Sequence, residues 1–329
     1  MTHFTRRDAL LSAAALAAGA ALPVSAQNAW PTKPISLVVP FPPGGSVDIS
    51  ARLINAPLAK ILGQPVVIDN RGGAGGSVGT SYVAKAPRDG YTLIVASQST
   101  HVANPVMQPN LGYDAIKDFA FVTILNRVPN VLVVHPSLPA KNFAEFIQYV
   151  RANPGKLNYA SPGNGSLAHL SMELFKSTQG LFITHIPYRG GGPALTDLLG
   201  GQVQMMWDNL SPQLANVQAG KLRALAIASP ARSPQLPDVP TFGELKLPDL
   251  NLTSWTGLAA PAGTPRPIID QLYAAVRSIV TVPANEELWR AKGLMVPEAV
   301  SPEQYTKEVK DRIKLFGDLV KVNKLSIDG

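Results

Sequence analysis

The alternation of short apolar runs with helical segments constrains this chain more than any other sequence feature. Near-continuous strands rich in valine and isoleucine, separated by helices, are typical of a mainly parallel sheet covered on both faces. At 329 residues the chain is long enough for two such units. The predicted strands are 35–41, 65–70, 91–97, 119–125, 131–136, 157–161, 182–188, 203–208, 222–229 and 254–261. The predicted helices are 47–62, 142–152, 167–178, 194–200, 267–280, 283–292 and 302–322.

The order of these segments predicts two doubly wound α/β lobes joined by a two-strand hinge. We expect residues 27–126 together with 254–329 to form lobe 1, and residues 127–253 to form lobe 2. Residues 231–251 contain four prolines and predict a long ordered loop that leads back toward lobe 1. Two strands, near 127–133 and 252–259, would then cross between the lobes.

Four glycine-rich turns follow predicted strands and form two similar pairs. Gly44 and Gly72 are 28 residues apart, and Gly163 and Gly190 are 27 residues apart. Glycines at such turns let backbone N–H groups approach a ligand, and the N-terminus of a following helix adds partial positive charge. The duplication predicts that two lobes face one small carboxylate across a cleft. The four turns are Pro42–Ser46, Arg71–Ser77, Ser161–Ser166 and Tyr188–Pro193.

The N-terminus has the pattern of a cleavable export signal. Arg6 and Arg7 precede an apolar stretch over 9–22, and Val24-Ser25-Ala26 ends in small residues suited to cleavage before Gln27. The arginine pair resembles a twin-arginine signal, although the general secretory route remains open. The apolar stretch of 14 residues is shorter than the roughly 20 needed to span a bilayer. We therefore expect residues 1–26 to be removed on export to the periplasm.

Composition excludes several classes of site. The chain has no cysteine, which rules out disulfides, thiolate ligands and a lipid-modified N-terminal cysteine. The four histidines after residue 26 are dispersed and no HExxH motif occurs, so we expect no metal site. The formal net charge is +7, but lysine and arginine form no basic run, so we expect no nucleic-acid partner.

Residues 73–79 carry two motifs that point to other functions. Their G-x-G-x-x-x-G spacing occurs in some dinucleotide sites, but no strand ending in an acidic residue follows about 20 positions later. We therefore expect no cofactor. Ser77 also lies in a formal G-x-S-x-G, although a nucleophile elbow follows its strand directly and six residues intervene here. An exported serine hydrolase that uses Ser77 remains an alternative.

Several motifs in order give the chain a family resemblance. They are WPTKPISLVVPFPPGGSVDISAR, VVIDNRGGAGGSVGT, APRDGYTLIVAS, YASPGNGSLAHLSMELF, HIPYRGGGPALTDLLGGQV, LPDVPTFGE and GLAAPAGTPRPIIDQL. The chain resembles the substrate-binding proteins of tripartite tricarboxylate transporters, the Bug-type periplasmic receptors. This resemblance implies a two-lobed fold like that of type II periplasmic binding proteins. It also implies capture of a small organic acid (a di- or tricarboxylate, an aromatic acid or an acidic amino acid) and its delivery to membrane transporter subunits. A sensor for a signalling partner is the alternative, and we expect a monomer.

The candidate site residues come from the glycine turns and from strand ends. Ser97 and Gln98 follow a strand where a parallel sheet opens toward its ligand. By resemblance, Phe41 would contact the ligand, Asp208 would belong to the site, and carboxylates would be held largely by backbone groups and water. Whether His169 and Arg189 contact the ligand is left open. The candidates are Phe41, Gly44, Gly45, Ser46, Gly76, Ser77, Ser97, Gln98, Ser161, Gly163, Gly165, Ser166, His169, Tyr188, Gly190 and Asp208.

Overall fold

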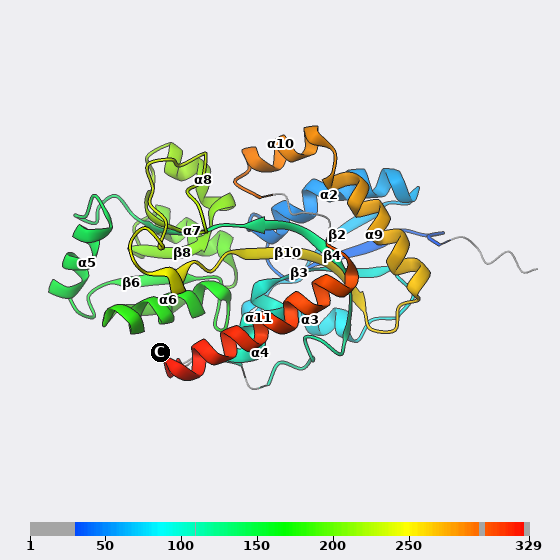
Figure 1. Cartoon of the computed structure of the whole chain (residues 1–329), viewed down its shortest axis with the longest axis horizontal. Helices are drawn as coiled ribbons and strands as arrows, with labels where there is room; N and C mark the ends of the chain where they lie inside the picture. The colour runs from blue at the N-terminus through cyan, green and yellow to red at the C-terminus, as the bar shows by residue number, and fades with distance from the viewer. Residues whose placement is uncertain (1–29, 109, 296–299, 326–329) are drawn as a thin grey trace, which may run out of the picture.

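Two α/β lobes lie side by side in the computed structural model, which describes residues 30–108, 110–295 and 300–325 (Figure 1). The predicted export signal, 1–26, lies outside the described residues. Within the described ranges, no helix is long and apolar enough to cross a membrane. The expected pair of α/β lobes is confirmed.

The elements alternate along the chain much as the sequence predicts. The strands are β1 (Ile35–Val39), β2 (Val66–Asn70), β3 (Thr92–Ser97), β4 (Phe119–Val128), β5 (Asn130–Val134), β6 (Asn158–Ser161), β7 (Thr184–Pro187), β8 (Met205–Asn209), β9 (Arg223–Ala228) and β10 (Ser254–Pro261). The α-helices are α2 (Ser46–Leu62), α3 (Ser77–Ala84), α4 (Asn104–Met107), α5 (Phe143–Ala152), α6 (Leu167–Gln179), α7 (Gly191–Leu199), α8 (Leu210–Gln218), α9 (Arg266–Val280), α10 (Pro283–Ala291) and α11 (Pro302–Val322). Short helical turns are η1 (Ala74–Gly76), η2 (Ser99–Ala103) and η3 (Pro248–Leu250).

Each lobe contains one five-stranded sheet, and the two sheets share one topology. The strand orders are β2-β1-β3-β10-β4 in lobe 1 and β7-β6-β8-β5-β9 in lobe 2. In each sheet one strand is antiparallel to its neighbours: β10 pairs this way with β3 and β4, and β5 with β8 and β9. The sheets are therefore mixed, and the expected mainly parallel sheet needs this correction. Each antiparallel strand is the first strand after the chain has crossed from the other lobe. It therefore runs opposite to the strands that the βα repeats place in the same sheet.

The chain crosses between the lobes twice. Pro129 separates β4 from β5, so the first crossing takes a single residue. The return runs through the segment 229–253, which includes η3, into β10. Ser254 at the start of β10 pairs with Val128 at the end of β4, which places the two crossings next to each other. The lobe boundaries given above remain predictions.

Three apolar clusters hold the layers together. In β1, Leu37 packs in a cluster with α2 and α9, whereas its neighbour Val38 packs in a cluster that includes α11. Successive strand residues point to opposite faces, so this alternation shows that helices cover both sides of the sheet. The cluster of Val38 continues into lobe 2, where it includes Trp207. A third cluster lies between β5, β8 and the helices α7 and α8.

Sequence periodicity located all ten strands but not every helix. The predicted helix list lacks α3, α4 and α8, because the first two are only eight and four residues long and the third contains Pro212. Helix α11 has the predicted bounds and runs beside β4 along the face of the molecule (Figure 1). Its apolar side buries Tyr305, Val309 and Phe316.

Candidate ligand-binding site

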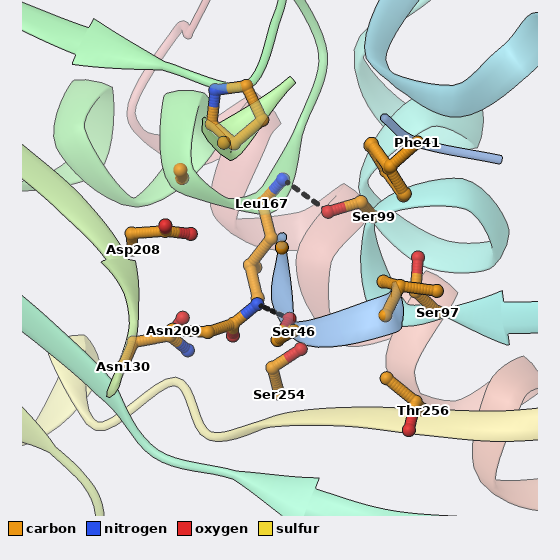
Figure 2. A pocket seen from close by; sticks show the side chains of 15 residues that line it. Phe41, Ser46, Ser97, Ser99, Asn130, Leu167, Asp208, Asn209, Ser254 and Thr256 are labelled. Atoms are coloured by element: carbon orange, nitrogen blue, oxygen red, sulfur yellow. Dashed lines mark hydrogen bonds between the residues drawn. The ribbon is translucent and has the colours of Figure 1, made fainter. Parts of the chain in front are cut away.

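A small cavity of about 40 Å³ lies between the two lobes. Its wall combines residues from the glycine turns, from the ends of β3 and β8, and from the crossing segments (Figure 2). The lining residues are Phe41, Gly45, Ser46, Val47, Ser97, Ser99, Asn130, Pro162, Leu167, Ala168, Gly191, Asp208, Asn209, Ser254 and Thr256.

Four helices begin at this cavity. Lobe 1 contributes the start of α2 at Ser46, and lobe 2 contributes the starts of α6, α7 and α8 at Leu167, Gly191 and Asn209. The first N–H groups of a helix have no intrahelical acceptor, and each N-terminus carries a charge of roughly +0.5. The residues that precede α2 and α7 are glycines, so no capping side chain occupies these N–H groups. The wall therefore presents converging donors and positive potential to whatever fills the cavity.

The cleft is closed, because glycine turns of one lobe touch those of the other. A Cβ atom at Gly190 would lie 2.5 Å from Cδ of Pro42, and one at Gly75 would lie 2.6 Å from the carbonyl oxygen of Asn164. Both glycines also have positive φ, +131° and +62° respectively. A side chain at either position would clash across the cleft. The glycines thus allow the two lobes to approach each other closely.

Hydrogen bonds join the lobes around the cavity. The side-chain amide of Asn209 donates to the Ser46 hydroxyl, and the Leu167 N–H donates to the Ser99 hydroxyl over 3.1 Å (Figure 2). Farther out, Gln108 donates to the carbonyl of Asn164 over 2.9 Å. Helix starts of both lobes are therefore tied to the opposite lobe in the closed form.

Asp208 is the one ionisable residue in the described cavity wall. Its side chain is 6% exposed and points into the cavity (Figure 2). Burial raises the pKa of this carboxyl to about 6, although a hydrogen bond from Gln213 Nε2 to Oδ2 (3.1 Å) opposes the shift. Among the ion pairs between described residues, none involves Asp208. A buried carboxyl without a cation is poised to change its protonation state.

A polar cluster lies behind the turn of lobe 2, away from the cavity. Ser161 contacts Nε2 of His185 at 2.6 Å, and the ring of His185 stacks on that of His169 with 4.1 Å between centroids. His169 Nδ1 accepts a hydrogen bond from the Gly165 N–H. Burial lowers the pKa of His169 to about 4 and that of His185 to about 3, so both rings are neutral near pH 7. This cluster braces the turn.

Five of the candidate residues line the cavity: Phe41, Gly45, Ser46, Ser97 and Asp208. Four of them lie in lobe 1, and Asp208 lies in lobe 2. The cavity wall does not include Gly44, Gly76, Ser77, Gln98, Ser161, Gly163, Gly165, Ser166, His169, Tyr188 or Gly190. Their direct contact with a ligand remains a prediction.

Most of these remaining candidates support the turns. Gly44 donates its N–H to Asp48, and a Cβ at Gly76 would lie 2.8 Å from the Phe41 ring. The Ser77 hydroxyl donates to the Ala74 carbonyl at 2.6 Å. The Tyr188 hydroxyl donates to Asp197.

Two further candidates lie at a helix start and after a strand end. The Ser166 hydroxyl accepts the N–H of His169 and so caps α6. Gln98 is fully buried outside the cavity wall. Arg189, left open above, is exposed and outside the cavity wall.

Sequence reasoning missed several lining residues. Ser254 and Thr256 are alternate residues of β10, and their period of two is the sequence signal that they share a face. Asn209 and Ser99 are close neighbours of the candidates Asp208 and Ser97. For Asn130 no local signal exists, because its place at the cavity depends on the crossing between the lobes.

No cluster of three or more histidine or acidic side chains suited to a metal occurs in the part of the chain that the structure describes. The donors at the cavity are hydroxyls, amides and backbone N–H groups, which suit the oxygens of an organic anion.

Comparison with known proteins shows which family this chain resembles. Residues 50–325 match the model of the tripartite tricarboxylate transporter family receptor. The chain is 39% identical to the protein BugT of Bordetella pertussis over 320 residues, which cover 97% of this chain and 98% of BugT.

Two solved structures of similar proteins contain organic acids. Rpa4515 of R. palustris with adipate is 39% identical, with a TM-score of 0.87, and the match covers 90% of this chain and 99% of that chain. MatC from Rhodopseudomonas palustris with bound malate is 38% identical, with a TM-score of 0.85, and the match covers 88% of this chain and all of MatC. At these identities and coverages the likeness extends to the whole two-lobed fold.

Proposed function

Since the chain belongs to the tripartite tricarboxylate transporter family of receptors, we propose that it captures a small organic carboxylate between its lobes and delivers it to membrane transporter subunits. The expected resemblance to the Bug-type receptors is thereby confirmed. We further propose that the receptor works in the periplasm, as a monomer, after removal of residues 1–26.

The convergence of four helix N-termini on one cavity carries this proposal. The uncapped starts of α2 and α7 supply N–H donors, and the starts of α6 and α8 add positive potential, whereas the described wall contains no lysine, arginine or histidine. A carboxylate can therefore be held without a buried cation. Because α2 lies in lobe 1 and the other three helices in lobe 2, one bound acid would bridge the lobes and favour closure.

The relatives indicate which acids to test. Adipate and malate, found with Rpa4515 and MatC, are both dicarboxylates. We propose that one carboxylate lies among the helix starts, in contact with Ser46, Leu167 and Gly191. The rest of the acid would extend toward Phe41 and Ser97.

Isothermal titration of the purified protein tests the proposal with malate, adipate, citrate, benzoate, glutamate and aspartate. An acid that binds should also raise the melting temperature, since a ligand at 100 times its Kd stabilises the folded state by about 2.7 kcal/mol. If no acid binds or stabilises the protein, the proposal is wrong.

Two alternatives need separate experiments. A sensor for a signalling partner requires the same receptor, so co-purification with membrane transporter subunits distinguishes delivery from sensing. The hydrolase alternative requires an activated Ser77, but this hydroxyl donates to a backbone carbonyl. Esterase activity that disappears in Ser77→Ala would revive it.

A further inference from the structure

A carboxyl group in the wall of a cavity that binds carboxylates needs an explanation. Asp208 is the penultimate residue of β8, beside the start of α8, and Asn209, the next residue, reaches across the cleft to Ser46. Its position therefore brings it close to any acid held by the helix starts. Two like charges in one small cavity would repel each other strongly.

We propose that Asp208 takes up one proton when a dicarboxylate binds and donates it in a hydrogen bond to the ligand. Asp208 would thus make capture of the acid dependent on pH. This inference rests on the proposed function. No bond other than the O–H bond of Asp208 is formed, and the proton comes from solvent.

The hydrogen bond from Gln213 fits a protonated Asp208. Gln213 Nε2 donates to Oδ2, and a carboxylic acid can keep this acceptor as its carbonyl oxygen. The other oxygen, Oδ1, can then carry the proton. The bond from Gln213 persists in both protonation states, so the side chain need not rotate when the ligand binds.

The helix N-termini disfavour the other explanation, in which Asp208 stays ionised and binds a ligand ammonium group. Four helix starts create positive potential in the cavity, which attracts anions and repels a cation. A neutral Asp208 leaves that potential available for the ligand carboxylates.

Other titratable groups near the site keep their charge state between pH 6 and 8. On α2, Asp48 accepts hydrogen bonds from Arg52 and Gly44. Although burial alone would raise its pKa, these bonds hold the pKa below its ordinary value. Behind the turn of lobe 2, the pKa values of His169 and His185 are lowered by burial to about 4 and 3.

The remaining elements packed around Asp208 are β5, α7 and α8. On α7, Asp197 accepts a hydrogen bond from Tyr188, whose own pKa burial raises to about 12. The neighbours of Asp208 on the other two elements are Val131, its partner in β5, and Gln213 on α8, and neither side chain titrates. Asp208, with a pKa of about 6 before the ligand binds, is therefore the group that changes charge in this range.

The test is isothermal titration with malate at pH 7.5 in buffers of different ionisation enthalpy, which counts the protons taken up. We expect about one proton per malate at pH 7.5, where malate is fully ionised, and a clearly smaller count near pH 6, where Asp208 is already partly protonated. The affinity should fall roughly tenfold per pH unit between pH 6.5 and 8. Adipate should behave in the same way.

Asp208→Asn mimics the neutral acid and should bind malate with no proton uptake, at least tenfold more tightly than the wild type at pH 8. Asp311→Asn, which removes an exposed carboxylate on α11, is the control and should keep the proton count of the wild type. If Asp208→Asn does not fold, the number of protons that the wild type takes up still tests the inference.

L-Aspartate differs from malate by an ammonium group in place of the hydroxyl, so it tests whether Asp208 stays ionised instead. Tighter binding of aspartate than malate without proton uptake would show that Asp208 stays ionised, and would overturn this inference alone. Binding of malate or adipate with no proton uptake at pH 7.5 would also overturn this inference alone. If no organic acid binds, the proposed function itself fails.

Discussion

The side-chain amide of Asn209, at the start of α8, donates a hydrogen bond to the hydroxyl of Ser46, at the start of α2. The two residues are 163 positions apart and belong to different lobes. Both line the cavity, so the same pair that would contact a ligand also holds the lobes together. With the ligand held as proposed, closure and binding would be coupled through these side chains.

Removal of the Ser46 hydroxyl should weaken binding. A neutral hydrogen bond contributes roughly 0.5–1.5 kcal/mol, so Ser46→Ala should raise the Kd for the bound acid by about 2- to 10-fold in isothermal titration. Ser81→Ala, which removes an exposed hydroxyl bonded to the carbonyl of Gly112, is the matched control and should leave the Kd unchanged. An unchanged Kd for Ser46→Ala would contradict the coupling.

A methyl group at Gly192 should oppose closure without straining the backbone of its own turn. Gly192 lacks a positive φ, but a Cβ there would lie 3.1 Å from the carbonyl oxygen of Pro43 in the other lobe. The Pro43 carbonyl must then give by a few tenths of an ångström, so we expect Gly192→Ala to reduce affinity several-fold in isothermal titration. Gly317→Ala on α11, where the nearest atom is 3.8 Å away, should leave the affinity unchanged.

The long loop between β9 and β10 should contribute to stability through Phe242. This side chain is fully buried and stacks on Trp207, with ring centroids 4.6 Å apart. Phe242→Ala should lower the free energy of unfolding by about 3–5 kcal/mol in denaturant titration. Phe182→Ala, at a residue 65% exposed, should change it by less than about 0.5 kcal/mol. Similar effects of the two substitutions would mean that the loop does not pack as described.

The ion pair between Arg127 and Glu308 should make stability depend on acid pH. Both nitrogens of the Arg127 fork donate to Glu308, over 2.7 and 2.8 Å, and fix α11 to the end of β4. Burial would raise the pKa of Glu308, but the bonds from Arg127 outweigh it, so the pKa lies below its ordinary value of 4.5. A lowered pKa stabilises the folded state above pH 4.5, and this contribution is lost as the pH falls through the folded value.

Glu308→Gln should therefore cost about 1–3 kcal/mol of unfolding free energy at pH 7, and the difference from the wild type should shrink below pH 4.5. Glu303→Gln, at an exposed pair with Arg266, is the control and should leave the unfolding free energy close to that of the wild type at any pH. A difference for Glu308→Gln that stays constant down to pH 3 would contradict this assignment.

Local patterns in the sequence predicted much of the fold and part of the site. The apolar run 254–261 coincides with β10, and the bounds of α11 match because a capping box at Ser301 fixes its start. The direction of β10 relative to its neighbours could not be predicted in this way. That direction depends on a strand pairing across more than 120 residues, such as Ser254 with Val128.

The sequence by itself predicted the two α/β lobes and the four glycine turns, and its candidates Phe41, Gly45, Ser46, Ser97 and Asp208 line the cavity. Strand periodicity and the backbone freedom of glycine are local properties, so each can be recognised within one short segment of the sequence. Only the tertiary structure decided which turn residues face the cavity. The convergence of the starts of α2, α6, α7 and α8, and the burial that raises the pKa of Asp208 to about 6, both require the lobes to close on each other.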